Sequence, residues 1–312
     1  MYLFQLADRL AKGLSQLEPA RLQSHRRFIL AHQMPDGGFR GREGESDLYY
    51  TGFAVRGLAV TGGIGDAARD AIERYLSTIE PLSLGAIDLL SWLYSALVVQ
   101  TAGGGNLLEG QETSFANSVA AMLEATRTED GGYAKNTTGA AGSTYQSFMV
   151  SLTYELIGRV QPRPNAVIQF LYDRQRDDGG FVEIAPMRRS GTNPTAAAVA
   201  LLNKLNGMDD DIADDVLGFL TDVASSEGGF QANTRIPFAD GLSTFTGLLT
   251  AQDLGRRDLL RPDRLLAWLT ESLEFPDGGF RGASWDQQAD VEYTFYGLGI
   301  LGLLHSEGTT GA

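Results

Sequence analysis

The sequence predicts an all-α protein, and within that class an α/α toroid (an α6/α6 barrel) of six helical-hairpin repeats of about 48 residues. Two patterns predict it: a glycine-rich turn recurs at nearly constant spacing, and amphipathic helices alternate with helices that are apolar on every side. The chain has 312 residues, of which 43% are hydrophobic and 21% charged, so it has ample apolar material for a core. We attribute the high glycine content, 38 residues, to the repeated turns.

The repeat is defined by a turn in which an acidic residue precedes two glycines and an aromatic residue. The first glycines of consecutive copies lie 94, 48, 49 and 50 residues apart. Because 94 is about twice the other spacings, one repeat has lost its turn, and we place that repeat near Leu84-Gly85, ahead of another apolar run. The five copies occupy residues 36–39, 130–133, 178–181, 227–230 and 277–280.

Each repeat is expected to contain two helices. The helix before the turn is amphipathic, and in the sixth repeat Pro262 stands where a first-turn proline is tolerated. We expect the two glycines to end this helix, because a left-handed cap favours glycine. The helix after the turn is apolar or small on every side, which predicts burial on every side. These second helices are expected at 49–60, 143–157, 195–205, 243–254 and 293–304.

The ends of the chain indicate that the hairpins close into a ring. An open array of repeats would carry polar capping repeats at its ends. Instead, the first and last turns are the most similar pair, since the sequence Pro-Asp-Gly-Gly-Phe-Arg-Gly occurs at 35–41 and again at 276–282. We therefore expect one toroid domain spanning residues 1–312 around an apolar central cavity.

Composition excludes several classes of function. The net charge is −14, so the chain lacks the basic face that nucleic acid or an anionic membrane surface would need. With no cysteine, it has no disulfide, no thiolate metal site and no cysteine nucleophile. No apolar run is long enough to span a bilayer, and the N-terminus does not resemble a secretion signal. We expect a cytoplasmic protein with no transmembrane segment and no nucleic-acid partner.

The turns and their period resemble the prenyltransferase and terpene-cyclase repeat superfamily. The Gln-x-x-Asp-Gly-Gly stretches that begin at Gln33 and Gln175 strengthen the resemblance, which covers essentially the full chain. By length and repeat count the chain is most similar to the β subunits of protein prenyltransferases, the type II geranylgeranyl transferase especially. The resemblance implies an apolar barrel that holds an isoprenoid or its diphosphate, a zinc at the rim that activates a thiolate, and a helical α-subunit-like partner.

The zinc ligands that the resemblance implies are incomplete here. In the family an Asp, and a Cys two residues later, open the fifth inner helix, and a His near the start of the sixth completes the protein ligands. Asp240 is present, but Leu242 stands at the cysteine position and a tyrosine of the stretch 290–297 at the histidine position. We therefore predict no cofactor and no metal ligands, and interpret Asp240 as a helix N-cap. A hard-cation site of Asp240, Asp290 and Glu292 is an alternative.

The acid of a terpene cyclase is also missing. Class II cyclases protonate an alkene with an Asp-x-Asp-Asp run before a Thr-Ala-rich inner helix. The matching stretch, residues 191–194, is Gly-Thr-Asn-Pro and carries no acid. The catalytic residues are unknown from sequence, and the sequence leaves open whether the chain is an enzyme.

A diphosphate-binding mouth is the site that the sequence favours. The loops after the turns carry arginines, whose planar guanidinium suits phosphate oxygens, and aromatic residues cluster at the starts of the inner helices. The alternatives are that the arginines pair with nearby acids such as Glu43, Glu183 and Asp286, and that the rings only fill the barrel. The predicted substrate-binding residues are Arg188, Arg189, Arg235, Asp240, Tyr50, Tyr145, Tyr293 and Tyr296.

Three functions are compatible with these patterns. The favoured one is a prenyltransferase-β-like protein that binds an isoprenoid or its diphosphate in the central cavity and transfers it, if at all, without the family's zinc mechanism. A second is a non-catalytic scaffold or partner-binding toroid, which a cavity filled by the protein's own side chains would favour. A third is a carbohydrate-active toroid, which needs two carboxylates about 5–10 Å apart, with Asp47, Asp240, Asp290 and Glu292 as candidates.

Overall fold

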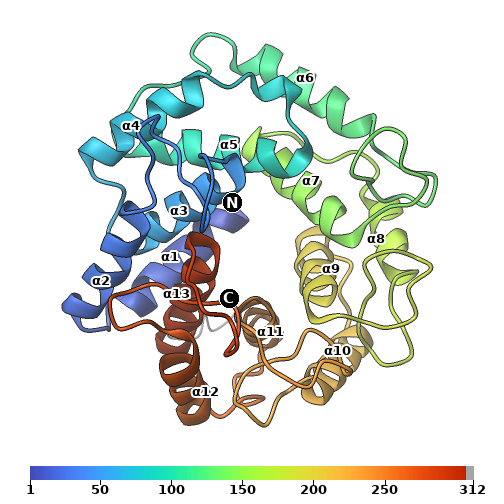
Figure 1. Cartoon of the computed structure of the whole chain (residues 1–312). Helices are drawn as coiled ribbons and strands as arrows, with labels where there is room; N and C mark the ends of the chain where they lie inside the picture. The colour runs from blue at the N-terminus through green and yellow to red at the C-terminus, as the bar shows by residue number, and fades with distance from the viewer. Residues whose placement is uncertain (307–312) are drawn as a thin grey trace. The chain divides into compact units, whose positions relative to one another are not determined.

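The computed structural model describes residues 1–306, which are helical with isolated β-bridges and no strand (Figure 1). The chain contains two compact units. Unit 1 comprises residues 1–84, 88–110 and 262–306, and unit 2 comprises residues 85–87 and 111–261. The predicted all-α class is confirmed, and the single domain over 1–312 stays a prediction.

Unit 1 holds the first two helix pairs and the last one, together with an additional N-terminal helix. Its elements are α1 (Tyr2–Leu14), α2 (Pro19–Leu30), α3 (Leu48–Val60), α4 (Asp66–Ser77), the 3₁₀ turn η1 (Pro81–Ser83), α5 (Ala86–Thr101, in this unit from Asp88), α12 (Pro262–Trp268), its π-helical continuation η2 (Leu269–Leu273) and α13 (Val291–His305). The inner helices α3, α5 and α13 are buried along most of their length, as their apolar sequences predict.

Unit 2 holds the third, fourth and fifth helix pairs of the chain. Its helices are α6 (Glu112–Glu124), α7 (Thr144–Leu156), α8 (Pro164–Tyr172), α9 (Thr192–Leu205), α10 (Asp210–Asp222) and α11 (Gly241–Asp253). The inner helix α9 packs between α7 and α11, and each expected inner helix of this unit is present within three residues of its predicted start and end. The repeat without a Gly-Gly turn is also where it was expected, because η1 joins α4 to α5 in its place.

The glycines of the turns do not end the outer helices, and that expectation was wrong. In the fourth repeat α8 ends at Tyr172 with a right-handed residue at its C-cap, whereas the turn glycine is Gly179. Gly179 has a φ of +82°, and a Cβ there would lie 2.1 Å from the carbonyl oxygen of Asp215 on the next outer helix. The glycine is therefore required by a tight turn and by contact with the following repeat.

The aromatic residue of each turn anchors the loop to the inner helix of its own repeat. The rings of the five turns are fully buried, and each backbone N–H donates to a Ser or Thr hydroxyl in the first or second turn of that helix. The N–H of Phe181, for example, donates to Thr195 Oγ1 at 2.8 Å. A hydroxyl 12 to 14 residues after the aromatic residue is thus a second mark of the repeat. The pairs are Phe39–Thr51, Tyr133–Ser147, Phe181–Thr195, Phe230–Thr244 and Phe280–Thr294.

The last repeat contacts the first within unit 1. A Cβ on Gly278 of the sixth turn would lie 2.4 Å from the carbonyl oxygen of Ser24 on α2, and the ring of Phe280 stacks on His25 at 4.7 Å. Helix α13 also packs against α3 (Figure 1). The first and last repeats are therefore in contact. In an open array of repeats, the two ends would instead carry polar caps and would not contact each other.

Helix α1 lies outside the repeats and was not predicted from the sequence. It packs against α13 and α3 (Figure 1). The ring of Phe4 contacts the ring of Tyr94 on α5, with 5.3 Å between the ring centroids. The C-terminal end of α1 approaches the backbone of α13 most closely, because a Cβ on Gly13 would lie 1.9 Å from the carbonyl oxygen of Gly302. Among the helices described, none is long and apolar enough to cross a membrane.

Candidate functional site

The predicted site residues fall into two groups, one in each unit. Unit 2 holds Arg188, Arg189, Arg235, Asp240 and Tyr145, and unit 1 holds Tyr50, Tyr293 and Tyr296. In both units these residues lie on the loops after the turns or in the first turns of the inner helices that follow them.

In unit 2, hydrogen bonds join each loop to the start of the preceding inner helix. Thr144, at the start of α7, donates its N–H to Glu183 O at 3.0 Å and its hydroxyl to Val182 O at 2.8 Å. Thr192, at the start of α9, donates its N–H to Ala232 O at 2.9 Å. The loop that carries Arg188 and Arg189 and the loop that carries Arg235 thus lie at the same end of the helices as Tyr145, whose side chain is 38% exposed.

The three predicted arginines of unit 2 are not neutralised. Within residues 1–306, no hydrogen bond or ion pair involves the guanidinium of Arg188, Arg189 or Arg235, and Arg189 is half-buried while the other two are exposed. The loop that carries Arg188 and Arg189 is nevertheless braced, because Arg176 donates to Ala185 O at 2.9 Å and to Met187 O at 3.1 Å. The alternative that these arginines pair with Glu183 is not what the structure shows, since Glu183 accepts from Ser143 instead.

Asp240 is the N-cap of α11, as its position before the helix predicts. One carboxylate oxygen accepts from the Ser243 N–H at 2.7 Å and the other from the Ser243 hydroxyl at 2.8 Å. Burial raises the pKa of this carboxyl, although the Ser243 bonds oppose the shift. With both oxygens engaged and an aliphatic side chain at Leu242, the residues here do not fit a zinc ion, which takes about four donors.

In unit 1 the predicted tyrosines lie along a row of aromatic rings. Tyr49 contacts Phe53 at 5.0 Å, Phe53 contacts Tyr296 at 5.3 Å, and Tyr296 contacts Tyr293 at 6.2 Å between ring centroids. Tyr50 joins the row through Tyr49 at 5.4 Å. The first turns of α3 and α13 thus meet in one aromatic cluster, and the structure brings Tyr50, Tyr293 and Tyr296 into it.

Two carboxylates of α13 lie beside this aromatic row. Glu292 accepts from the Tyr49 hydroxyl at 2.7 Å, and Asp290 accepts from the Tyr293 N–H at 2.9 Å as the helix N-cap. Burial raises the pKa of both carboxyls, and the Asp290 charge adds to the shift of Glu292. Burial and these two carboxylates likewise raise the pKa of Tyr50. The aromatic row therefore has two carboxyl groups beside it.

Of the two arginines in the first loop, Arg40 and Arg42, only Arg42 pairs with this acidic group. Arg42 forms an ion pair with Asp286, and its Nε lies 3.1 Å from Asp290 Oδ2. Arg281 is also engaged, because it donates to Ser272 O at 2.6 Å and to Asp286 O at 2.9 Å. The alternative that loop arginines pair with Asp286 is therefore confirmed for Arg42 and not for the arginines of unit 2.

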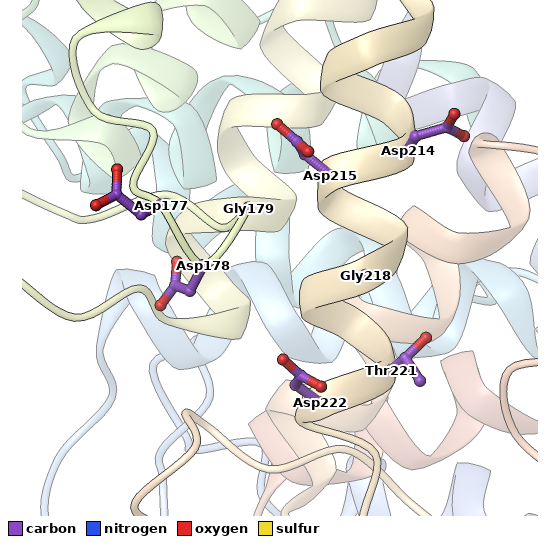
Figure 2. A pocket seen from close by; sticks show the side chains of 8 residues that line it. All are labelled: Asp177, Asp178, Gly179, Asp214, Asp215, Gly218, Thr221 and Asp222. Carbon is purple, nitrogen blue, oxygen red and sulfur yellow. The ribbon is translucent and has the colours of Figure 1, made fainter.

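An acidic groove of about 470 Å³ lies elsewhere in unit 2, between the turn at 177–179 and α10. Figure 2 shows its carboxylates pointing in different directions along the groove and not toward a common point. Within the described part of the chain, no three His, Asp or Glu side chains are grouped closely enough to hold a metal, so the hard-cation alternative gains no support. The negative charge also makes this groove unsuitable for a diphosphate. Its acidic residues are Asp177, Asp178, Asp214, Asp215 and Asp222.

Comparison with known proteins assigns the fold. The family described as Prenyltransferase alpha-alpha toroid domain matches residues 3–84 and 87–310. The chain belongs to this family. Both the predicted α/α-toroid class and the resemblance drawn from the turn motif are confirmed.

Individual relatives are more distant. The geranylgeranyl transferase type-2 subunit beta of Candida albicans is 30% identical over 144 residues, which are 44% of this chain and 41% of that protein. The match thus spans about two fifths of the length of that relative. Candida albicans protein geranylgeranyltransferase-I complexed with GGPP aligns with a TM-score of 0.57 and 15% identity, covering 94% of this chain and 82% of that chain.

The same fold also occurs in a glycoside hydrolase. The GH76A α-1,6-mannanase of Salegentibacter sp. HEL1_6 aligns with a TM-score of 0.61 and 12% identity, covering 91% of this chain and 98% of that chain. At such identities the structural likeness establishes the fold alone. The function must therefore be argued from the site.

Proposed function

We propose that the protein binds an isoprenoid diphosphate, with the diphosphate held by Arg188, Arg189 and Arg235 of unit 2. The observation that carries this proposal is that these arginines have no partner within residues 1–306, although the chain carries a net charge of −14. Uncommitted guanidinium groups in an acidic protein can bond phosphate oxygens in pairs without first breaking an ion pair.

The helix beside these loops offers a surface for the isoprenoid chain. On α9, Ala196 and Ala200 are one turn apart and half-buried, so they present small apolar side chains along the helix. The stripe begins at the end of α9 where Arg188 and Arg189 lie. The family and the β-subunit relative support the same ligand class, since the structure of a related toroid is a complex with GGPP.

The proposal does not include the family's zinc chemistry, because Asp240 is engaged as an N-cap and no second zinc donor stands at Leu242. Any transfer of the prenyl group would proceed without zinc. A helical α-subunit-like partner also belongs to the proposal. It rests on the name of the curated relative, which is a subunit.

A scaffold without a ligand is the second candidate, and one observation favours it. Helix α1 packs on the inner helices α3 and α13 in unit 1, and a cavity between them, lined by residues such as Leu6, Val60 and Phe295, measures only about 20 Å³. A scaffold that kept the fold and lost its site would show such filling. The carbohydrate alternative has weaker support, because Asp290 is held by Arg42 and by the N–H of Tyr293.

Binding of geranylgeranyl diphosphate decides between these candidates. Thermal unfolding with the diphosphate at about 100 times its Kd should be stabilised by about 2.7 kcal/mol, and geranylgeraniol, which lacks the diphosphate, should stabilise much less. The shift should fall in Arg188→Ala and Arg235→Ala and persist with EDTA. Arg159→Ala is the matched control, because this exposed arginine follows the opposite end of α7. No shift in folded protein would favour the scaffold.

A further inference from the structure

The contact between the last and first repeats differs from other contacts between repeats in one buried side chain. At four of these contacts a turn glycine lies against a carbonyl oxygen of the next outer helix, and the residue after that carbonyl is fully buried. Where the sixth turn meets α2, this residue is His25, whereas at the other three contacts it is aliphatic. A titratable side chain therefore stands at the one contact of the four that joins the last repeat to the first. The three aliphatic residues are Ile72, Val167 and Val216.

The sixth turn also uses this histidine in place of an acceptor of its own. In three other turns the N–H of the second glycine donates to the aspartate of the same turn, at 3.0 to 3.3 Å. In the sixth turn the N–H of Gly279 donates instead to His25 Nδ1 at 3.0 Å. Gly279 has a φ of +88°, whereas the second glycines of the three other turns do not have a positive φ. The pairs in those turns are Gly38–Asp36, Gly132–Asp130 and Gly180–Asp178.

The two partners of His25 determine where its proton lies. A backbone N–H can only donate, so Nδ1 carries no proton, and Nε2 carries one and donates to Glu274 Oε1 at 3.0 Å. Burial by itself would raise the pKa of Glu274, but hydrogen bonds from His25 and Arg21 outweigh burial and lower it. This carboxyl group therefore stays ionised through the range in which histidine gains its charge. It continues to accept from Nε2, so Nδ1 keeps facing Gly279.

No acceptor is available for a second proton on the ring. Within residues 1–306, Glu274 is the one charged group that interacts with His25, and Arg21 pairs with Glu274 from the same helix as His25. Helices α3 and α13, which also pack on α2, bring no charged or titratable group to the ring. A proton on Nδ1 would therefore point at the N–H of Gly279, and two N–H groups cannot bond each other.

We propose that His25 is a proton-sensitive latch between the last and first repeats, which holds the sixth turn on α2 when the ring is neutral and releases it when the ring is protonated. Protonation leaves the buried N–H of Gly279 without a partner, a cost that movement of residues 276–280 away from α2 relieves. Turns whose acceptor is an aspartate do not respond in the same pH range. The latch is independent of the proposed diphosphate site.

Amide hydrogen exchange of the wild-type chain, corrected for the intrinsic exchange rate, tests the latch. The protection of Gly279 should fall by about tenfold or more from about pH 7.5 to about pH 5, as expected for the loss of one buried hydrogen bond. The protection of Gly180, which donates to Asp178, should change less than about twofold. Nitrogen NMR of the imidazole at the higher pH should find the proton on Nε2. A proton on Nδ1, unchanged protection of Gly279, or an equal loss at Gly180 would each overturn the proposal.

His25→Asn is the variant that separates the proton from the contact. Its side-chain oxygen is an acceptor near the position of Nδ1 and does not titrate, so the protection of Gly279 should be equal at the two pH values. His32→Asn is the matched control, because His32 is a half-buried histidine at the end of α2 that bonds only Phe28 O. This variant should keep the wild-type response to pH. If the response persists in His25→Asn or disappears in His32→Asn, another group controls the turn and the proposal is wrong.

Discussion

The loops of unit 1 and those of unit 2 share one backbone design, but they differ in how their arginines are engaged. Both follow a Gly-Gly-aromatic turn anchored by a Ser or Thr hydroxyl on the next helix. In unit 1 the loop arginine Arg42 is paired with Asp286 and Asp290, whereas the side chain of Arg40 in the same loop has no partner within residues 1–306. In unit 2 the arginines Arg188 and Arg235 have no partner within residues 1–306.

This contrast shows that counting charges on a loop does not reveal which are available. An arginine in an ion pair must break that pair before it binds a ligand, whereas an uncommitted arginine loses only its hydration. The loop arginine that lies beside the aromatic row of unit 1 is paired with carboxylates, whereas Arg188 and Arg235 of unit 2 are not. The proposed function places the diphosphate on unit 2 for this reason.

The largest expected effect is a loss of stability when a turn glycine that contacts the next repeat is replaced, because both units use this contact. Gly278→Ala in unit 1 and Gly179→Ala in unit 2 should each cost more than about 3 kcal/mol, because the new Cβ would lie 2.4 Å or 2.1 Å from a backbone oxygen at a positive φ. Gly44→Ala, which has a φ of +91° and open space around it, should cost about 1 kcal/mol. Urea unfolding measures all three. Similar losses for Gly44 and Gly179 would show that the repeat contact is unimportant.

A smaller effect should separate the two sets of loop arginines. Arg42→Ala leaves the buried Asp290 carboxylate without its cation and should cost about 2 kcal/mol, less than a fully buried pair because Arg42 is partly exposed. Arg188→Ala should change the free energy of unfolding by less than about 0.5 kcal/mol. Equal losses in the two variants would mean that Arg188 has a structural partner and would weaken the proposed diphosphate site.

The smallest expected effects concern how the stability of the protein changes with pH, and they should have opposite signs for Glu292 in unit 1 and Asp130 in unit 2. Burial raises the pKa of Glu292, so its stabilising protonation is lost as the pH rises through the folded pKa, and Glu292→Gln should gain stability relative to the wild type above about pH 4.5. In unit 2 the pKa of Asp130 is lowered. Burial by itself would raise this pKa, but it is outweighed by hydrogen bonds from Thr128, Gly142 and Gly132 and by the charge of Arg174.

The stability that Asp130 contributes is therefore present above its unfolded pKa and is lost as the pH falls through the folded pKa. Asp130→Asn should lose stability relative to the wild type as the pH rises toward about pH 5, with little further change above it. Urea unfolding of both variants and the wild type between pH 3 and pH 7 tests the signs. A common sign for the two variants would contradict the contrast between the units.

Several features of the site were accessible from the sequence alone. The repeat period located the inner helices and the repeat without a turn, and its place before the fifth inner helix identified Asp240 as an N-cap. A further feature of the sequence also marks each repeat: a Ser or Thr follows the aromatic residue of the turn by 12 to 14 residues and accepts a hydrogen bond from its N–H.

The sequence by itself determined the helix types and their order, because hydrophobic periodicity, glycine turns and N-caps act between residues close along the chain. Only the tertiary structure decided which arginines are committed, since Arg42 meets Asp286 and Asp290 across 244 and 248 residues. The same holds for helix α1, whose place against α3 and α13 depends on the close backbone contact of Gly13 with Gly302. Ion pairs and backbone contacts between distant segments depend on distances that no local pattern encodes.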